Sequence, residues 1–232
     1  MLVSDRPQHP VTTAIVDPPS THVMPDLNAG SSTAPSATDC AEKSTKPARV
    51  QHIWIVTGPA GCGKSTVGEG LRQELGVPFL EGDDYHPQLN KEKMGRGTPL
   101  TDEDRWDWLV ALRKAAIDVL APSSERNSPA GVVVACSALK QKYRDVMRVA
   151  AYGSPSVHIH FIYLQLDEDV LMERVRARQQ HYMKSGMVRS QLATLEEPKD
   201  EWDVITINVQ GSPAEVQQRV HDAVTAKLAE YV

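Results

Sequence analysis

The chain has 232 residues, of which 41% are hydrophobic and 24% charged, and its formal net charge at pH 7 is −5. This length suits one folded domain with a tail, and the acidic balance predicts no nucleic-acid partner, because phosphate backbones select basic surfaces. No apolar run approaches the roughly 18 residues of a membrane span, so no membrane association is predicted. Three cysteines without metal-ligand spacing favour free thiols in a reducing, cytoplasmic compartment.

The first 48 residues differ in composition from the rest of the chain. They contain many Ser, Thr, Ala and Pro residues and show no sustained hydrophobic period. Such a segment buries too little apolar surface to offset the entropy lost on ordering. We therefore expect a disordered extension over residues 1–48 and a folded domain over residues 49–232. The alternative, a transit peptide, is disfavoured because such peptides are poor in acidic residues and this segment contains four aspartates.

Residues Gly58–Ser65 match the pattern G-x-x-x-x-G-K-[ST] at every fixed position. The apolar run His52–Thr57 before them is typical of a buried strand, and the apolar spacing over Val67–Leu75 after them is typical of a helix that ends at Gly76. A strand, a Gly-rich turn and a helix N-terminus form a phosphate-binding loop, because backbone N–H groups and the helix dipole face the anion. A surface turn that matches by chance is the alternative interpretation.

This loop predicts a nucleoside triphosphate, ATP, with Mg²⁺ as cofactor. Lys64 is expected to reach the β- and γ-phosphates, and the Ser65 hydroxyl is expected to bind Mg²⁺. Cys62 is interpreted as a small loop residue instead of a redox centre. The predicted nucleotide-binding residues of the loop are Gly58, Pro59, Ala60, Gly61, Cys62, Gly63, Lys64, Ser65 and Thr66.

Five strand-like segments alternate with helical segments after Arg49. A capping signature at Thr101–Asp104 opens one helix, and the last helix begins after Ser212, with proline and glutamate in its first turn. This alternation predicts an α/β fold with a doubly wound, five-stranded parallel sheet. The predicted strands are residues 52–57, 78–81, 131–136, 160–164 and 204–209.

Three features favour a small kinase among proteins with such a loop. The domain has no room for the accessory modules of motors or helicases, and the guanine-reading pattern N-K-x-D is absent. Polar residues cluster after the second and third strands, and arginines cluster after the fourth. In small P-loop kinases these places hold the acceptor and the lid.

Two long motifs follow the second and third predicted strands. Residues 81–109 follow D-G-D-x-x-H-P-x-x-N-x-x-K-M-x-x-G-x-P-L-x-D-x-D-R-x-x-W-L except at the first position, and residues 136–145 read C-S-A-L-K-x-x-Y-R-D. With matching positions between 174 and 198, this arrangement resembles the gluconate kinase (gluconokinase) family of P-loop sugar-acid kinases. The resemblance covers nearly everything from residue 50 to the C-terminus.

This resemblance implies a P-loop kinase fold of the nucleoside/shikimate-kinase-like type with a helical lid. It implies a transferase that uses ATP to phosphorylate the 6-hydroxyl of D-gluconate, giving 6-phospho-D-gluconate for carbohydrate metabolism through the pentose phosphate pathway. It also implies a cytoplasmic homodimer. The predicted catalytic residues are Lys64, Asp83 and Arg178.

Two aspartates that follow the second predicted strand are expected to have different roles. Asp83 is expected to accept the proton of the substrate hydroxyl, whereas Asp84 is expected to cap the local turn; the alternative is that Asp83 also caps a turn. Glu81 stands where the family usually has aspartate, so its carboxylate is displaced by about one methylene. Magnesium that is held through water tolerates this displacement, and the predicted metal ligands are Ser65 and Glu81.

A sugar acid presents a carboxylate, which a guanidinium grips in plane. Arg105 is the first choice for this contact, and Lys140 and Arg144 follow. The alternative for Arg105 is an ion pair within its own helix, and the alternative for His86 is a turn residue before proline. The predicted substrate-binding residues are Asp83, His86, Lys93, Arg105, Lys140 and Arg144.

Arg174 and Arg178 lie four residues apart on one predicted helix face. A solvated basic face is the ordinary interpretation of such a pair. The resemblance instead implies a lid in which Arg174 stacks on adenine and Arg178 clamps the phosphates. Rival functions are another small-molecule kinase, for shikimate or a nucleoside monophosphate, a kinase acting on nucleic-acid ends, and a noncatalytic nucleotide-dependent binding module.

Overall fold

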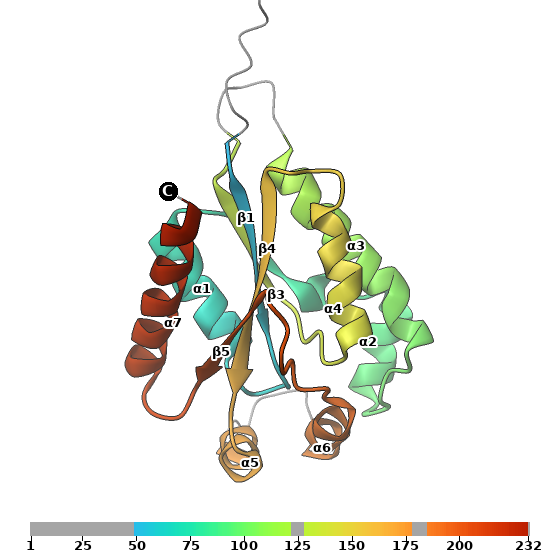
Figure 1. Cartoon of the computed structure of the whole chain (residues 1–232). Helices are drawn as coiled ribbons and strands as arrows, with labels where there is room; N and C mark the ends of the chain where they lie inside the picture. The colour runs from blue at the N-terminus through green and yellow to red at the C-terminus, as the bar shows by residue number, and fades with distance from the viewer. Residues whose placement is uncertain (1–48, 122–127, 178–184, 232) are drawn as a thin grey trace, which may run out of the picture. The chain divides into compact units, whose positions relative to one another are not determined.

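The computed structural model describes residues 49–121, 128–177 and 185–231, and the predicted extension over residues 1–48 lies outside them. Its centre is a five-stranded sheet in which all neighbouring strands are parallel, in the order β2-β3-β1-β4-β5 (Figure 1). The predicted fold class is confirmed. The strands are β1 Gln51–Thr57, β2 Phe79–Glu81, β3 Gly131–Ala135, β4 Val157–Gln165 and β5 Val204–Asn208.

Helices cover both faces of the sheet (Figure 1). Helices α1 (Lys64–Leu75) and α7 (Pro213–Leu228) lie on one face, and α3 (Glu103–Leu120) and α4 (Gln141–Arg148) lie on the other. Beyond the carboxyl ends of the strands lie two further helices (Figure 1), α5 Glu168–Ala177 and α6 Ser185–Thr194. The remaining elements are α2 Gln88–Gly95 and three 3₁₀ turns, η1 Gly82–Tyr85, η2 Val149–Ala151 and η3 Ala229–Tyr231.

Strand β1 shows why the sheet needs helices on both sides. Trp54 and Val56 pack into the core beneath α1 and α7, whereas Ile53 and Ile55 pack into the core beneath α3 and α4. A strand covered on both faces must be apolar at every position, which is the pattern that the sequence shows there. Because β1 lies between β3 and β4, the chain crosses to opposite sides of it, and ligands of such sheets bind at this switch point.

Strand β4 begins three residues earlier than predicted. His158 and His160 pair in register with His52 and Trp54 of β1, and His52 Nδ1 lies 3.1 Å from His160 Nε2. Trp54 stacks on the His160 ring at a centroid distance of 4.4 Å. The strand start was predicted too late because histidines interrupt the apolar run that marks a buried strand. In the fold these histidines pack as aromatic rings.

Two of the predicted helix ends are confirmed. Ser212 and Glu215 form a capping box at the start of α7, and Gly76 ends α1 with a φ of 63°. Thr101 and Asp104 also bond each other reciprocally, since the Thr101 N–H donates to the Asp104 carboxylate at 2.9 Å. Within the described part of the chain, no helix is long and apolar enough to cross a bilayer.

Candidate active site

The phosphate-binding loop joins β1 to α1. Gly58, Gly61 and Gly63 have φ values of 141°, 89° and 109°, a region that favours glycine. A Cβ on Gly61 would lie 2.6 Å from Val175 Cγ2, so the loop packs closely against α5. Gly63 lies at the N-terminus of α1. A Cβ added to it would face open space, with none of the surrounding heavy atoms within 4 Å. This concave backbone at a helix N-terminus fits phosphate groups.

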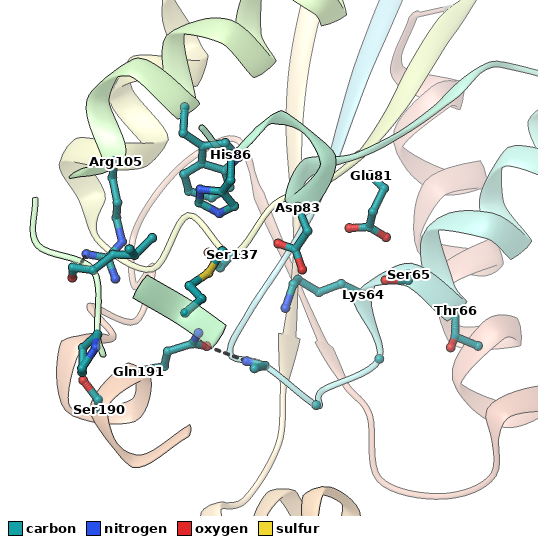
Figure 2. A pocket seen from close by; sticks show the side chains of 17 residues that line it. Lys64, Ser65, Thr66, Glu81, Asp83, His86, Arg105, Ser137, Ser190 and Gln191 are labelled. Atoms are coloured by element: carbon teal, nitrogen blue, oxygen red, sulfur yellow. Dashed lines mark hydrogen bonds between the residues drawn. The ribbon is translucent and has the colours of Figure 1, made fainter. Parts of the chain in front are cut away.

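The loop forms one wall of a cavity of about 310 Å³ at the carboxyl ends of β1, β2 and β3. Figure 2 shows the polar side chains that surround it. Its volume lies in the range of small-molecule sites. Besides the loop, the cavity is lined by Glu81, Asp83, His86, Met94, Pro99, Leu100, Arg105, Trp108, Ser137, Ser190 and Gln191.

Four chemically complementary groups meet beside the phosphate loop. The Asp83 side chain points toward Lys64 (Figure 2), and Lys64 Nζ donates to the Pro59 carbonyl oxygen at 3.1 Å. The Ser65 hydroxyl and the Glu81 carboxyl group line the same wall of the cavity. Burial raises the pKa of Glu81 above its usual value and the negative charge of Asp83 adds to this, whereas Ser65 and Lys64 oppose it. A divalent cation placed here would favour the ionised form of Glu81.

His86 is a buried polar group that faces the same cavity. Its ring stacks on Trp108 at a centroid distance of 4.0 Å, and Trp108 Nε1 donates to the Gly82 carbonyl oxygen at 2.6 Å. Burial lowers the pKa of His86 to about 4, so the ring is neutral at pH 7. Its Nδ1 atom has no hydrogen-bond partner in the described structure. This buried nitrogen is therefore a hydrogen-bonding group left unpaired in the wall of the cavity.

Arg105 reaches the cavity from the first turn of α3. Its Nη1 atom donates to the Leu100 and Thr101 carbonyl oxygens at 2.5 and 2.9 Å. The alternative, an ion pair with Asp102, is not found in the described part of the chain. Asp102 instead binds Lys140 at 2.9 Å and also contacts Lys142 and the Tyr143 hydroxyl. These three donors hold the pKa of Asp102 well below its usual range.

Three predicted substrate residues lie outside the cavity lining. Lys93 is bonded to Asp104 at 2.6 Å, and Lys140 is bonded to Asp102. Arg144 is 1% exposed, and its guanidinium donates to Glu201 and to three backbone carbonyl oxygens. With every donor bonded inside the protein, Arg144 supports the fold, and this placement corrects the prediction that it binds substrate.

Arg174 lies on the other side of the phosphate loop. Its Nη2 atom donates to the Val209 carbonyl oxygen at 2.7 Å, and it lines a second cavity together with Cys62, Thr66 and Pro213. The stacking of Arg174 on the adenine base remains a prediction. Arg178 lies outside the described residues.

Seven residues of the cavity lining were not predicted from the sequence, and two of them, Ser137 and Gln191, bond to the loop region. Ser137 follows β3, where its carbonyl oxygen accepts the Thr57 hydroxyl at 2.5 Å. Gln191, on α6, accepts a hydrogen bond from the Ala60 backbone N–H at 2.7 Å (Figure 2). Both residues belong to blocks that match the family pattern, which is the one signal that could have singled them out.

Comparisons with known proteins agree with this geometry. A family profile described as an AAA domain matches residues 53–198. A probable gluconokinase of Schizosaccharomyces pombe is 43% identical over 75% of this chain and 88% of its own length, and the thermoresistant gluconokinase of Escherichia coli K12 is 42% identical over 68% and 85%. The crystal structure of a gluconokinase from Sinorhizobium meliloti 1021 superposes with a TM-score of 0.66 at 40% identity, covering 79% of this chain and 96% of that one. The chain therefore belongs to the gluconokinase family of P-loop kinases.

Proposed function

We propose that this kinase transfers the γ-phosphoryl group of MgATP to the 6-hydroxyl of D-gluconate. The observation that carries the proposal is the position of the Asp83 carboxylate between the phosphate loop and the end of the cavity that holds His86 and Arg105. One cavity thus offers a phosphate nest, a proton acceptor and a carboxylate partner. The names of the curated relatives support the same activity.

Each residue has a defined part in this reaction. The loop N–H groups and Lys64 neutralise the phosphates, because phosphoryl transfer depends mainly on positioning and charge neutralisation. Asp83 accepts the proton of the attacking hydroxyl as the new P–O bond forms and the bond to ADP breaks. Ser65 and Glu81 would hold Mg²⁺, which supplies further positive charge to the phosphates when bound.

The far end of the cavity would hold the sugar acid. Arg105 already donates to two carbonyl oxygens through Nη1, which leaves Nε and Nη2 for a carboxylate. The neutral His86 ring would form part of the wall beside the hydroxyl groups. The apolar side chains of Met94, Pro99 and Leu100 limit the space beside them.

The function is tested by ADP release with MgATP and, in turn, D-gluconate, shikimate, AMP and a 5′-hydroxyl oligonucleotide. Turnover with gluconate alone is expected. Turnover with another acceptor would overturn the substrate assignment, and nucleotide binding without turnover would support a binding module. The homodimer and the cytoplasmic location remain predictions, and light scattering of the purified chain tests the first.

Replacing Arg105 with lysine is expected to raise the KM for gluconate about 10- to 100-fold, with the KM for ATP little changed. Lysine keeps the charge but lacks the planar fork that holds a carboxylate by two bonds, and a hydrogen bond to a charged group contributes about 1.5–3 kcal/mol. Steady-state kinetics in both substrates measure the effect. Arg96→Lys, on an exposed side chain directly after α2, is the matched control. An unchanged gluconate KM would remove Arg105 from the substrate site.

Replacing Glu81 with glutamine is expected to raise the Mg²⁺ concentration needed for half-maximal activity about tenfold. The substitution removes the charge beside Ser65 but keeps the size of the side chain, and Mg²⁺ prefers carboxylate oxygens. A magnesium titration at fixed ATP measures the shift. Glu81→Asp, which restores the residue usual in the family, is expected to retain the wild-type requirement. Equal requirements in all three proteins would place Mg²⁺ elsewhere.

A further inference from the structure

Gln191 joins α6 to the phosphate loop across a sequence separation of 131 residues. Its Oε1 atom accepts the Ala60 N–H at 2.7 Å. The same peptide group has a second partner, because the Pro59 carbonyl oxygen accepts a hydrogen bond from Lys64 Nζ at 3.1 Å. A single peptide of the loop is therefore held from one side by the catalytic lysine and from the other by Gln191.

The Ala60 contact fixes which way the Gln191 amide faces. A backbone N–H needs an acceptor, so the oxygen must face Ala60 and the nitrogen must face away from it. Figure 2 shows the amide nitrogen turned away from the loop and into the cavity. Its two N–H donors have no acceptor within residues 49–121, 128–177 and 185–231. The polar end of Gln191 thus faces ligand space beside the loop.

An anion is the ligand chemistry that suits these donors. The cavity wall next to Gln191 consists of the phosphate loop and Lys64, which bind phosphate oxygens. A side-chain amide donates without adding a full charge, and a donor whose position is fixed before the reaction stabilises developing charge effectively. The bond to Ala60 provides this fixed position.

We propose that the Gln191 amide donates a hydrogen bond to the terminal phosphoryl group of the nucleotide, with its oxygen anchored on Ala60. The inference rests on the proposed phosphoryl transfer from ATP and adds a residue from α6 to that reaction. It predicts that Gln191 distinguishes a nucleoside triphosphate from a diphosphate, because the terminal group is the one that it contacts.

Two substitutions separate this role from a simple tether. Gln191→Glu keeps the shape and the acceptor for Ala60 but loses both donors and places a negative charge beside the phosphoryl group. Gln191→Met removes donor and acceptor without adding charge. Gln218→Glu, on the exposed side of α7, adds the same charge far from the cavity and serves as the control. Thermal unfolding of each protein verifies that it is folded.

Calorimetric titration with Mg²⁺ and either ADP or the β,γ-imido analogue of ATP provides the decisive measurement. Both Gln191 variants are expected to lose about tenfold in affinity for the analogue while their affinity for ADP stays within threefold of wild type. An equal loss for both nucleotides, or no loss, would overturn the proposal and leave Gln191 as a tether. This readout needs no acceptor, so a wild-type protein inactive on gluconate would refute the proposed function without deciding the role of Gln191.

Turnover supplies the second measurement. The kcat of Gln191→Glu is expected to fall about 100-fold and that of Gln191→Met about tenfold, since the first also repels the phosphoryl group. Wild-type turnover in Gln191→Met would show that the donors are dispensable and would overturn the proposal.

Discussion

Replacing Asp83 with asparagine is expected to reduce kcat for gluconate phosphorylation about a thousandfold while the Kd for MgATP stays within threefold. Asparagine has the shape of aspartate but cannot accept a proton, and a positioned general base contributes about 10²- to 10⁴-fold. The Asp83 side chain lines the cavity outside the phosphate loop and points toward Lys64, so its loss is expected to affect the acceptor hydroxyl more than the nucleotide. Single-turnover kinetics and calorimetry measure the two quantities separately.

The neighbouring Asp84→Asn is the matched control, because Asp84 is exposed and does not line the cavity. Its kcat is expected to remain within twofold of wild type. A loss below tenfold in Asp83→Asn would mean that another group takes the proton. Asp83→Asn also removes a negative charge that raises the pKa of Glu81, so Mg²⁺ binding is expected to be retained in this variant.

Features that depend on neighbouring residues could be predicted from the sequence. The phosphate loop, the helix that follows it and the capping box at Ser212 each need only a few consecutive residues, because glycine conformations and cap hydrogen bonds are local. The parallel sheet could also be predicted, because strands alternate with helices along the chain. Two parallel neighbouring strands need a crossover connection between them, and this connection is usually a helix. The start of β4 could not be predicted in this way, because its histidines are polar residues in the sequence but pack as aromatic rings in the fold.

The roles of basic residues show the limit of such reasoning. Arg105 and Arg144 both belong to matching motifs, and either could hold a carboxylate by its chemistry. Their surroundings separate them, since Arg105 lines the cavity whereas the guanidinium of Arg144 binds Glu201 from a distant loop. Gln191 gave no local signal either, because its partner Ala60 is brought to it by the fold alone. Partners far apart in sequence must be seen in three dimensions.

Replacing Arg144 with methionine is expected to lower the free energy of unfolding by about 3–5 kcal/mol, the range observed when one partner of a buried ion pair is removed. The guanidinium donates to Glu201 at 2.5 and 2.9 Å, and the Glu201 side chain is only 12% exposed. Arg148 would remain as a partner for Glu201, but the carbonyl oxygens that Arg144 binds would lose their donor. Urea unfolding followed by circular dichroism measures the change.

The effect is expected to reach the active site through the loop after β3. Ala138 has a φ of 36°, unfavourable for a residue with a side chain, and its carbonyl oxygen accepts from Arg144 at 3.0 Å. Ser137, the residue before it, lines the cavity, so Arg144→Met is expected to raise the gluconate KM as well as to destabilise the protein. Arg96→Met, on an exposed side chain, should change stability by less than about 0.5 kcal/mol. A loss below about 1 kcal/mol in Arg144→Met would show that Arg148 alone sustains the network.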